Sequence, residues 1–284
     1  MADSEKWAVS GPKVIEVGGP DEIVHELRVA LVAGRVDVVA HDEDEGARVE
    51  VHRVHGRELE VIWERGSLVV RHPQVRWDNI LEGIRGMARG EDSADLSIAV
   101  PAGTSVQVGT VSADGLVAGL HAPAMVRTVS GALVLDGVHG TVGARTLSGQ
   151  VDVRDQHGPL SGESVSGSLT VQAVEVDDLD LKTVSGALAV DLTSPARRIS
   201  LKSVSGDLTV RIPAGSGFRF DAASVSGNVV ADGRRIASGP TGHRAGELRE
   251  GDEAVRISAK SVSGDVTLLR AATTGPSLTK TVTS

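Results

Sequence analysis

The stretch SVSGDLTV, residues 203–210, recurs along most of the chain in close copies. We take the residue before each Ser-Gly pair, or before Ser-Ala in the first copy, as the anchor of that copy. The anchors are Val111, Val129, Leu147, Val165, Val184, Val204, Val225 and Val262. Successive anchors lie 18, 18, 18, 19, 20, 21 and 37 residues apart. A nearly constant period of this size predicts a repeat architecture.

Each copy alternates apolar and polar residues with the two-residue period of a β-strand. In the quoted copy, Val204, Leu208 and Val210 share one parity and are predicted to face a dry interior, whereas the intervening Ser, Asp and Thr face water. Ile199 and Leu201 have the opposite parity, so the chain slips by one residue between Leu201 and Val204. The same slip recurs in other copies, which predicts two strand segments per repeat, joined by a corner or bulge.

Glycine follows the anchor by two residues in seven of the eight copies. Its parity is that of the dry face, so either no side chain fits there or the backbone needs a positive φ. One repeat buries too few aliphatic residues to offset its ordering entropy, so neighbouring copies have to stack. The sequence therefore predicts an all-β, single-stranded β-solenoid (β-helix) of about eight clear coils from residue 106 to 269, with coils about 4.8 Å apart.

Composition agrees with a narrow aliphatic interior, because the chain holds two Phe, three Trp and no Tyr. The formal net charge of −9 argues against nucleic acid or an anionic membrane as a main partner. No cysteine is present, which excludes disulfides and thiolate metal sites. The first residues lack the basic start and apolar run of a secretory signal, and no apolar run would span a bilayer. A cytoplasmic protein is therefore expected, although a chain whose signal had been removed would read the same way.

The same pattern predicts how the whole chain is divided. Residues 1–26 form a polar lead-in, and residues 27–105 form an N-terminal β region that either continues the solenoid or caps it. Within that region, helical spacing of apolar residues predicts a short helix over 77–88. The repeats occupy residues 106–270, with a polar loop insertion at 232–254, and residues 271–284 are a disordered tail.

Several stretches resemble a known family. They are IEVGGPDEIVHELRVALVAGRVDVVAHD (15–42), LSIAVPAGTSVQVGTVSADG (96–115), and the serial TVSGALVL (128–135), SVSGSLTV (164–171) and SVSGDLTV (203–210). They are similar to a bacterial β-strand-repeat family, a domain of unknown function labelled "putative adhesin", and the likeness covers roughly residues 14–270. A looser likeness is to the bactofilins, bacterial β-solenoids that polymerise end to end. The resemblance implies a β-solenoid without an established catalytic site.

No constellation of residues points to catalysis, a metal or a cofactor. The nine histidines show no metal-ligand spacing, and His52 and His55 fall on opposite faces of a strand. An acidic cluster, Glu175, Asp177, Asp178 and Asp180, is interpreted as a solvated turn. No nucleophile elbow, phosphate loop or dinucleotide fingerprint is present. We therefore expect no enzymatic activity and no cofactor.

Hydroxyl residues flank every anchor, and the parity of the strand predicts two parallel columns on one outer face. The members considered as candidate surface residues are Thr128, Ser130, Thr146, Ser148, Ser164, Ser166, Thr183, Ser185, Ser203 and Ser205. The columns either bond rung to rung beside the corner or present a flat surface to a repetitive ligand such as a polysaccharide. The first hypothesis for function is a non-enzymatic scaffold or protein-interaction module that binds a protein partner or copies of itself. The alternative is a cell-surface adhesin or glycan-binding protein that uses the hydroxyl face.

Overall fold

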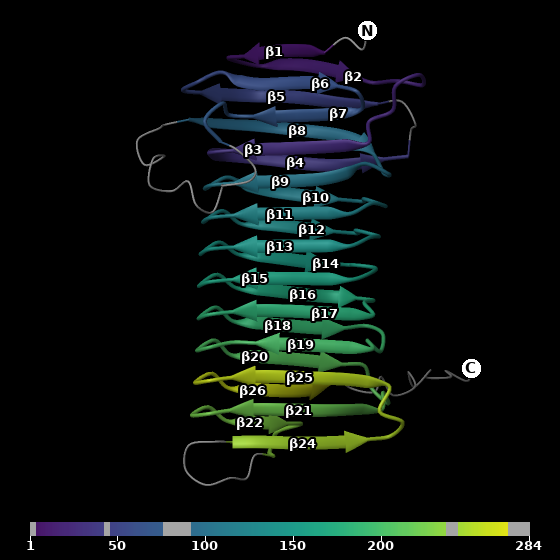
Figure 1. Ribbon diagram of the computed structural model, residues 1–284, viewed down its shortest axis with the longest axis vertical. Helices are drawn as coiled ribbons and strands as arrows, with labels where there is room; N and C mark the ends of the chain where they lie inside the picture. The colour runs from purple at the N-terminus through teal and green to yellow at the C-terminus, as the bar shows by residue number, and fades with distance from the viewer. Residues whose placement is uncertain (1–3, 43–45, 76–91, 237–243, 272–284) are drawn as a thin grey trace, which may run out of the picture.

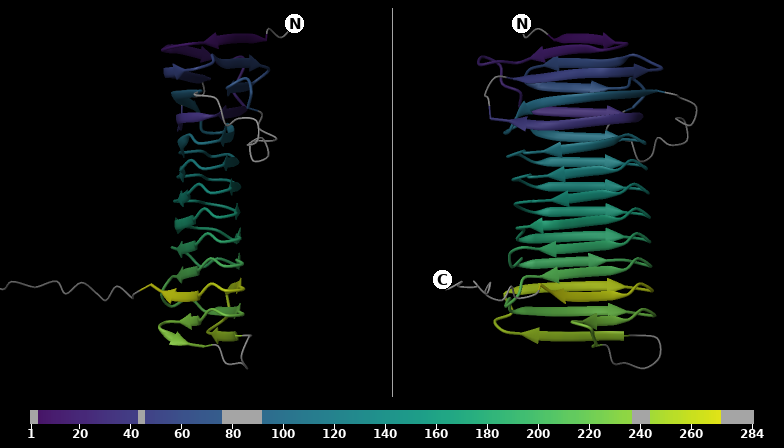
Figure 2. Two further views of the ribbon diagram at one scale, coloured as in Figure 1. Left: turned by 90° about the vertical axis from the view of Figure 1, so that its left-hand side faces the viewer. Right: turned by 180° about the vertical axis from the view of Figure 1, so that it is seen from behind.

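The computed structural model describes residues 4–42, 46–75, 92–236 and 244–271, and these residues form one tall stack of β-strands (Figure 1). Two sheets of thirteen strands lie back to back with the apolar core between them, which the side view in Figure 2 shows. The prediction of an all-β solenoid is confirmed.

The first sheet, which we call sheet A, holds the strand that precedes each corner. In spatial order its strands are β1 (Glu5–Val9), β6 (Leu59–Glu64), β7 (Ser67–Arg71), β3 (Glu26–Leu31), β9 (Ser105–Thr110), β11 (Ala124–Thr128), β13 (Val142–Thr146), β15 (Leu160–Ser164), β17 (Asp178–Thr183), β19 (Arg198–Lys202), β25 (Val255–Ser261), β21 (Phe218–Ser224) and β24 (Arg244–Glu250).

The second sheet, sheet B, holds the strand that follows each corner. Its spatial order is β2 (Lys13–Val17), β5 (Ala47–His55), β8 (Ser93–Pro101), β4 (Ala33–His41), β10 (Asp114–Ala118), β12 (Leu133–Asp136), β14 (Val151–Arg154), β16 (Leu169–Val174), β18 (Leu188–Leu192), β20 (Leu208–Ile212), β26 (Val266–Arg270), β22 (Val229–Ala231) and β23 (Arg234–Arg235).

Each coil is one strand of sheet A, a corner and one strand of sheet B, and coils pair in parallel with equivalent residues in register. Leu208, for example, lies between Leu188 and Val266 in the ladder, and all three side chains are buried. This register stacks aliphatic residues directly over one another, so a single core runs through the whole stack.

The predicted position of the corner is wrong, because the change of parity falls between Ser203 and Gly206 and not between Leu201 and Val204. The anchor Val204 is 49% exposed, whereas Ser203 before it is 8% exposed and Leu208 is buried. The hydroxyl oxygen of Ser203 accepts a hydrogen bond from the backbone N–H of Gly206 at 2.7 Å. This local bond turns the hydroxyl inward and leaves the anchor valine outside the corner.

The glycine of each corner is explained by crowding and not by a positive φ. A Cβ added to Gly186 would overlap the carbonyl oxygen of Gly167 in the preceding coil, and a Cβ on Gly206 would overlap that of Gly186. Neither glycine has a positive φ. The backbones of successive corners therefore approach too closely for any side chain.

The N-terminal region both continues and caps the solenoid. The β3–β4 coil and the β7–β8 pair add parallel layers, while β1, β2, β5 and β6 pair antiparallel beyond them. Strands β1 and β2 lie inside the predicted polar lead-in, and that prediction is wrong because Val9, Ile15 and Val17 are buried. Their short apolar sets fill the end of the core.

The C-terminal coils are not stacked in chain order. After β20 the chain skips one layer to form β21 and β22, and then returns to place β25 and β26 in the vacant layer. In Figures 1 and 2 this returning coil is the yellow layer between green ones. The eight predicted coils are all present, and the last in sequence is the seventh in space.

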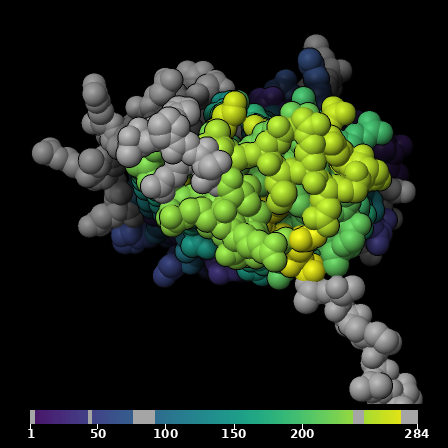
Figure 3. Space-filling view, turned by 90° about the horizontal axis from the view of Figure 1, so that it is seen from below, coloured from purple at the N-terminus to yellow at the C-terminus, as the bar shows by residue number. Residues whose placement is uncertain are grey.

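Residues 232–254, predicted to be a polar loop, contain β23 and β24, which cap the lower end by antiparallel pairing. The light-green to yellow residues cover this end in the view from below (Figure 3). Aromatic residues lie at both ends of the stack: Phe218 and Phe220 are buried next to β24, and Trp63 is buried next to β1.

The predicted helix over 77–88 and the tail from residue 272 lie outside the described residues. Among the described residues, no helix has the length and apolar character needed to cross a membrane.

Candidate ligand-binding face

Of the two predicted hydroxyl columns, one is buried and the other lies at the surface. The column before the anchors is buried, with exposures of 0–8%, and its candidate members are Thr128, Thr146, Ser164, Thr183 and Ser203. Their prediction as surface residues is wrong, because these hydroxyls point inward and form hydrogen bonds with backbone atoms of the corners. Thr183 Oγ1, for instance, accepts the backbone N–H of Gly186 at 2.9 Å, which would otherwise have no partner in the corner.

The column after the anchors lies at the surface and comprises Ser130, Ser148, Ser166, Ser185 and Ser205. Each hydroxyl donates to a backbone carbonyl of the preceding coil, as Ser148 does to Val129 at 3.0 Å and Ser205 to Val184 at 3.3 Å. The single hydroxyl proton is thereby engaged, so only acceptor positions face the solvent. Its role as a ligand-binding surface stays a prediction.

The anchor residues themselves form an exposed apolar column beside these serines. Val165, Val184, Val204 and Val262 are 44%, 47%, 49% and 48% exposed, and we call these four residues the valine ridge. Backbone bonds from Val204 N–H to Val184 O and from Val262 N–H to Val204 O, each 3.2 Å, place the last three in adjacent coils. Sequence reasoning missed the ridge because it assigned every anchor to the interior.

A second column missed from the sequence consists of histidines. His121, His139 and His157 are 18 residues apart, which is the repeat period, and the rings of His139 and His157 stack with centroids 4.3 Å apart. His157 also lies 3.5 Å from Glu175, whereas Asp178 and Asp180 belong to sheet A, so the predicted acidic cluster is divided. Within the described ranges, no group of three or more potential metal ligands is arranged to hold an ion.

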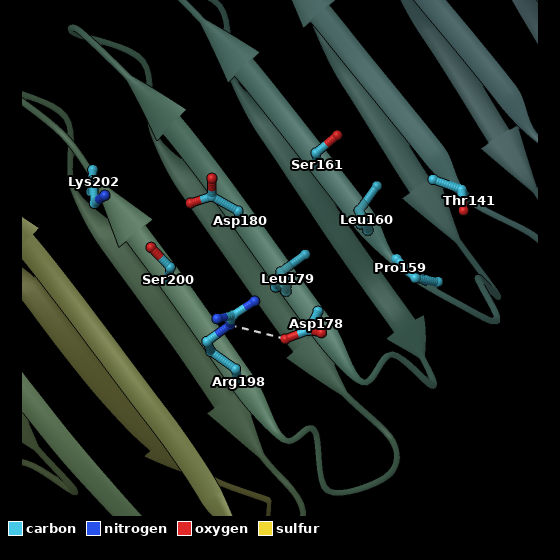
Figure 4. A pocket seen from close by; sticks show the side chains of 10 residues that line it. All are labelled: Thr141, Pro159, Leu160, Ser161, Asp178, Leu179, Asp180, Arg198, Ser200 and Lys202. Atoms are coloured by element: carbon cyan, nitrogen blue, oxygen red, sulfur yellow. Dashed lines mark ion pairs between the residues drawn. The ribbon is translucent and has the colours of Figure 1, made fainter.

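The outer face of sheet A carries a shallow trough. Its central lane holds small or short side chains in register, Gly143, Ser161, Asp180, Ser200 and Ser258. A depression of about 450 Å³ opens over four of these coils, and Figure 4 shows Ser161, Asp180 and Ser200 following one another across neighbouring strands.

Charged side chains form both walls of this trough. On one side Arg198 Nε lies 2.9 Å from Asp178 Oδ1, the ion pair dashed in Figure 4, and on the other Lys182 Nζ lies 2.8 Å from Asp180. Partial burial opposes the ionisation of Asp180, but hydrogen bonds from Lys182 and Ser200 outweigh it and hold its pKa below the usual range. The described residues that line the depression include no histidine, so its serines have no imidazole base beside them.

The stacked coils and the antiparallel strands at both ends define the class of protein, a capped β-solenoid with long, regular faces. The chain belongs to the Toastrack DUF4097 family, whose model matches residues 20–269. No curated protein matches the chain. It is similar to a solved structure of a "putative cell adhesion protein" from Clostridium sporogenes, with 10% identity, a TM-score of 0.24, and coverage of 95% of this chain and 100% of that one. It is also similar to a "putative lipid binding protein" from Parabacteroides distasonis, with 14% identity, a TM-score of 0.44, and coverage of 92% and 97%.

Proposed function

We propose that this protein is a non-enzymatic scaffold that associates laterally with a protein partner, which we take to be a second copy of itself. The observation that carries the proposal is the valine ridge. Single exposed valines are ordinary, but a contiguous apolar column beside polar residues is typical of an interaction surface.

The chain itself covers the other end of the same column. Val129 and Val75 are buried in a small apolar cluster with Ala30 and Val32, separate from the main core. The anchors Val111 and Leu147 pack against that cluster. Apolar side chains therefore already pack on the anchor column where the chain can reach it, and the valine ridge is the part left uncovered.

Lateral pairing is favoured because antiparallel strands close both ends of the stack. Two ridges related by a two-fold axis have the same spacing of about 4.8 Å between side chains, so they can interdigitate. Four valines are a small contact compared with a stable interface, so we expect weak, concentration-dependent association.

Sedimentation velocity over a wide concentration range tests this proposal. The double variant Val184→Asp/Val204→Asp should remain a folded monomer at concentrations where the unmodified protein associates, because it places charges in the contact. The matched control, Thr170→Asp/Thr209→Asp on the outer face of sheet B, adds the same charge elsewhere and should associate normally. A protein that stays monomeric at every concentration, or a ridge variant that associates as before, contradicts the proposal.

The second candidate function is glycan binding or cell adhesion by the outer serine column. The observation in its favour is the regular spacing of Ser130, Ser148, Ser166, Ser185 and Ser205 along the stack. A glycan array probed with the protein and with Ser148→Ala/Ser166→Ala tests it, and binding absent from the array would remove it. This candidate requires export, whereas the scaffold is compatible with the predicted cytoplasmic location, which stays a prediction.

A further inference from the structure

Two strands far apart in the sequence carry the same pentapeptide pattern. Residues 198–202 read RISLK and residues 256–260 read RISAK, 58 positions later. Because the last coil returns to the layer beside β19, the two pentapeptides become neighbours in register. Arg198 pairs with Arg256, Ser200 with Ser258, and Lys202 with Lys260.

All six of these polar side chains share the outer face of sheet A, because Ile199 and Ile257 between them are buried. Adjacent strands lie about 4.8 Å apart, and an arginine and the lysine four residues on are about 13 Å apart along a strand. The result is a small rectangle with an arginine or a lysine at each corner and two hydroxyls at its centre. Arg198, Ser200 and Lys202 are seen from outside in Figure 4, on the wall and floor of the depression.

The rectangle holds four cationic side chains, and the neighbouring carboxylates offset only part of their charge. Asp178 pairs with Arg198, and attraction between Asp180 and Lys202 helps to lower the pKa of Asp180. Arg198 is paired with Asp178, but in the part of the chain that the structure describes, Arg256, Lys202 and Lys260 form no ion pair. Cations elsewhere on this face are compensated: Lys182 pairs with Asp180, Arg219 with Asp221 and Glu247, and Arg249 with Glu247 and Glu253. In a chain with a net charge of −9, these cations on adjacent strands form a local region of positive potential, which favours the binding of an anion.

Carboxylates limit the length of this cationic area. In the central lane, Asp180 precedes Ser200 and Asp221 follows Ser258. A long polyanion lying along the lane would meet both carboxylates, whereas a compact anion fits between them. The hydroxyl of Ser258, the two lysine ammonium groups and the planar guanidinium of Arg256 suit the several oxygen atoms of a tetrahedral group better than a single carboxylate.

We propose that the paired RISLK and RISAK strands form a binding site for one tetrahedral oxyanion, a phosphate or sulfate group carried by a ligand. Arg256, Lys202 and Lys260 supply the charge, with Arg198 shared between the ligand and Asp178. Ser258 donates a hydrogen bond to the anion, whereas the Ser200 hydroxyl already donates to Asp180. The site uses none of the valine ridge, so it is independent of lateral association.

Isothermal titration with inorganic phosphate, inorganic sulfate, glycerol phosphate and acetate tests the proposal on the full chain. We expect saturable one-to-one binding of phosphate or sulfate that weakens with added salt, and at least tenfold weaker binding of acetate. Glycerol phosphate binding like phosphate would assign the site to phosphate monoesters, whereas preference for sulfate would assign it to sulfate groups.

The variant Arg256→Gln/Lys260→Gln should lose at least tenfold in affinity while keeping its melting temperature. The control Arg154→Gln/Arg211→Gln makes the same charge change on the outer face of sheet B and should bind as the unmodified protein does. Absence of phosphate and sulfate binding, or equal loss in both double variants, would overturn the site. Affinity that rises with chain length from phosphate to tripolyphosphate and beyond would overturn the discrete site in favour of a nonspecific cationic surface.

Discussion

At the scale of single residues, the corners depend on the hydroxyl that precedes each anchor. In five of the described corners the Ser or Thr side chain accepts the backbone N–H of the glycine three residues later, as Ser203 does from Gly206 at 2.7 Å. In two others the hydroxyl donates to the carbonyl of that glycine, at 3.0 Å from Thr146 and 2.6 Å from Ser164. The serine after the anchor bonds only at the surface, to a carbonyl of the preceding coil. The two hydroxyls, two residues apart in sequence, are therefore expected to contribute unequally to the free energy of unfolding.

Replacing Ser203 with Ala should destabilise the protein by about 1–3 kcal/mol, because it leaves a buried backbone N–H without a partner. Ser205→Ala, which removes an exposed hydroxyl, should cost less than about 1 kcal/mol. Urea unfolding of the two variants beside the unmodified protein measures both effects. Equal losses would show that the inner hydroxyl does not support the corner.

His72 is a buried base whose neutral form the fold requires. Its side chain has no solvent exposure, and its Nδ1 accepts the backbone N–H of Val32 at 3.2 Å. Burial lowers the pKa of His72 below the ordinary value of 6.5, although the nearby carboxylate of Asp92 opposes that shift.

Stability should therefore decline as the pH falls below about 6.5, where the unfolded chain binds a proton at His72 that the folded chain does not. One such group contributes a slope of at most about 1.4 kcal/mol per pH unit, and the loss ends once the pH reaches the lower folded pKa. Urea midpoints between pH 7.5 and 5 should fall less steeply in His72→Gln than in the unmodified protein. Parallel pH profiles would refute this role for His72.

At the scale of strands and corners, the two-residue period predicted the inward residues of each strand correctly but not the corner itself. Ile199, Leu201, Leu208 and Val210 are all buried, as alternation requires. The corner was misplaced because the apolar anchor was assumed to face inward. A local hydrogen bond of the hydroxyl before the anchor turns the anchor outward, and the alternation of apolar and polar residues does not reveal that bond. The same error placed the buried hydroxyl column on the surface and concealed the valine ridge.

The stacked glycines of the corners should not tolerate a side chain. Gly186→Ala should destabilise the protein by about 1–3 kcal/mol, because its Cβ would overlap backbone of the preceding coil that is held by ladder bonds on both sides. Gly103→Ala is the matched control, since a Cβ there meets no described atom within 4 Å and φ is not positive. Thermal unfolding of both variants decides the point, and a Gly186→Ala protein as stable as the control would mean that the corners can move apart.

At the scale of the whole molecule, the order of the coils could not be predicted. A 37-residue spacing between Val225 and Val262 fits a long loop as well as it fits a cap followed by a return. The two RISxK pentapeptides are visible in the sequence, but their adjacency is not, because neighbours in a solenoid are expected to be consecutive in sequence. The cationic rectangle exists only because the last coil occupies the layer beside β19.

The returning coil should also be needed for the lower end to fold. Strand β21 pairs with β25 on one side, and a chain ending at residue 254 would lack β25 and β26 entirely. We expect residues 218–236 and 244–250 of that truncated chain to lose protection in hydrogen exchange, because buried Phe218 and Phe220 lose Val255 and Ile257 as neighbours. Residues 124–192 should stay protected, and a chain ending at residue 271 should match the full chain. Retained protection over 218–231 would instead mean that β21 and β22 pair with β19 and β20 in the truncated chain. One coil could then replace another, and side-chain packing would not fix the order of the layers.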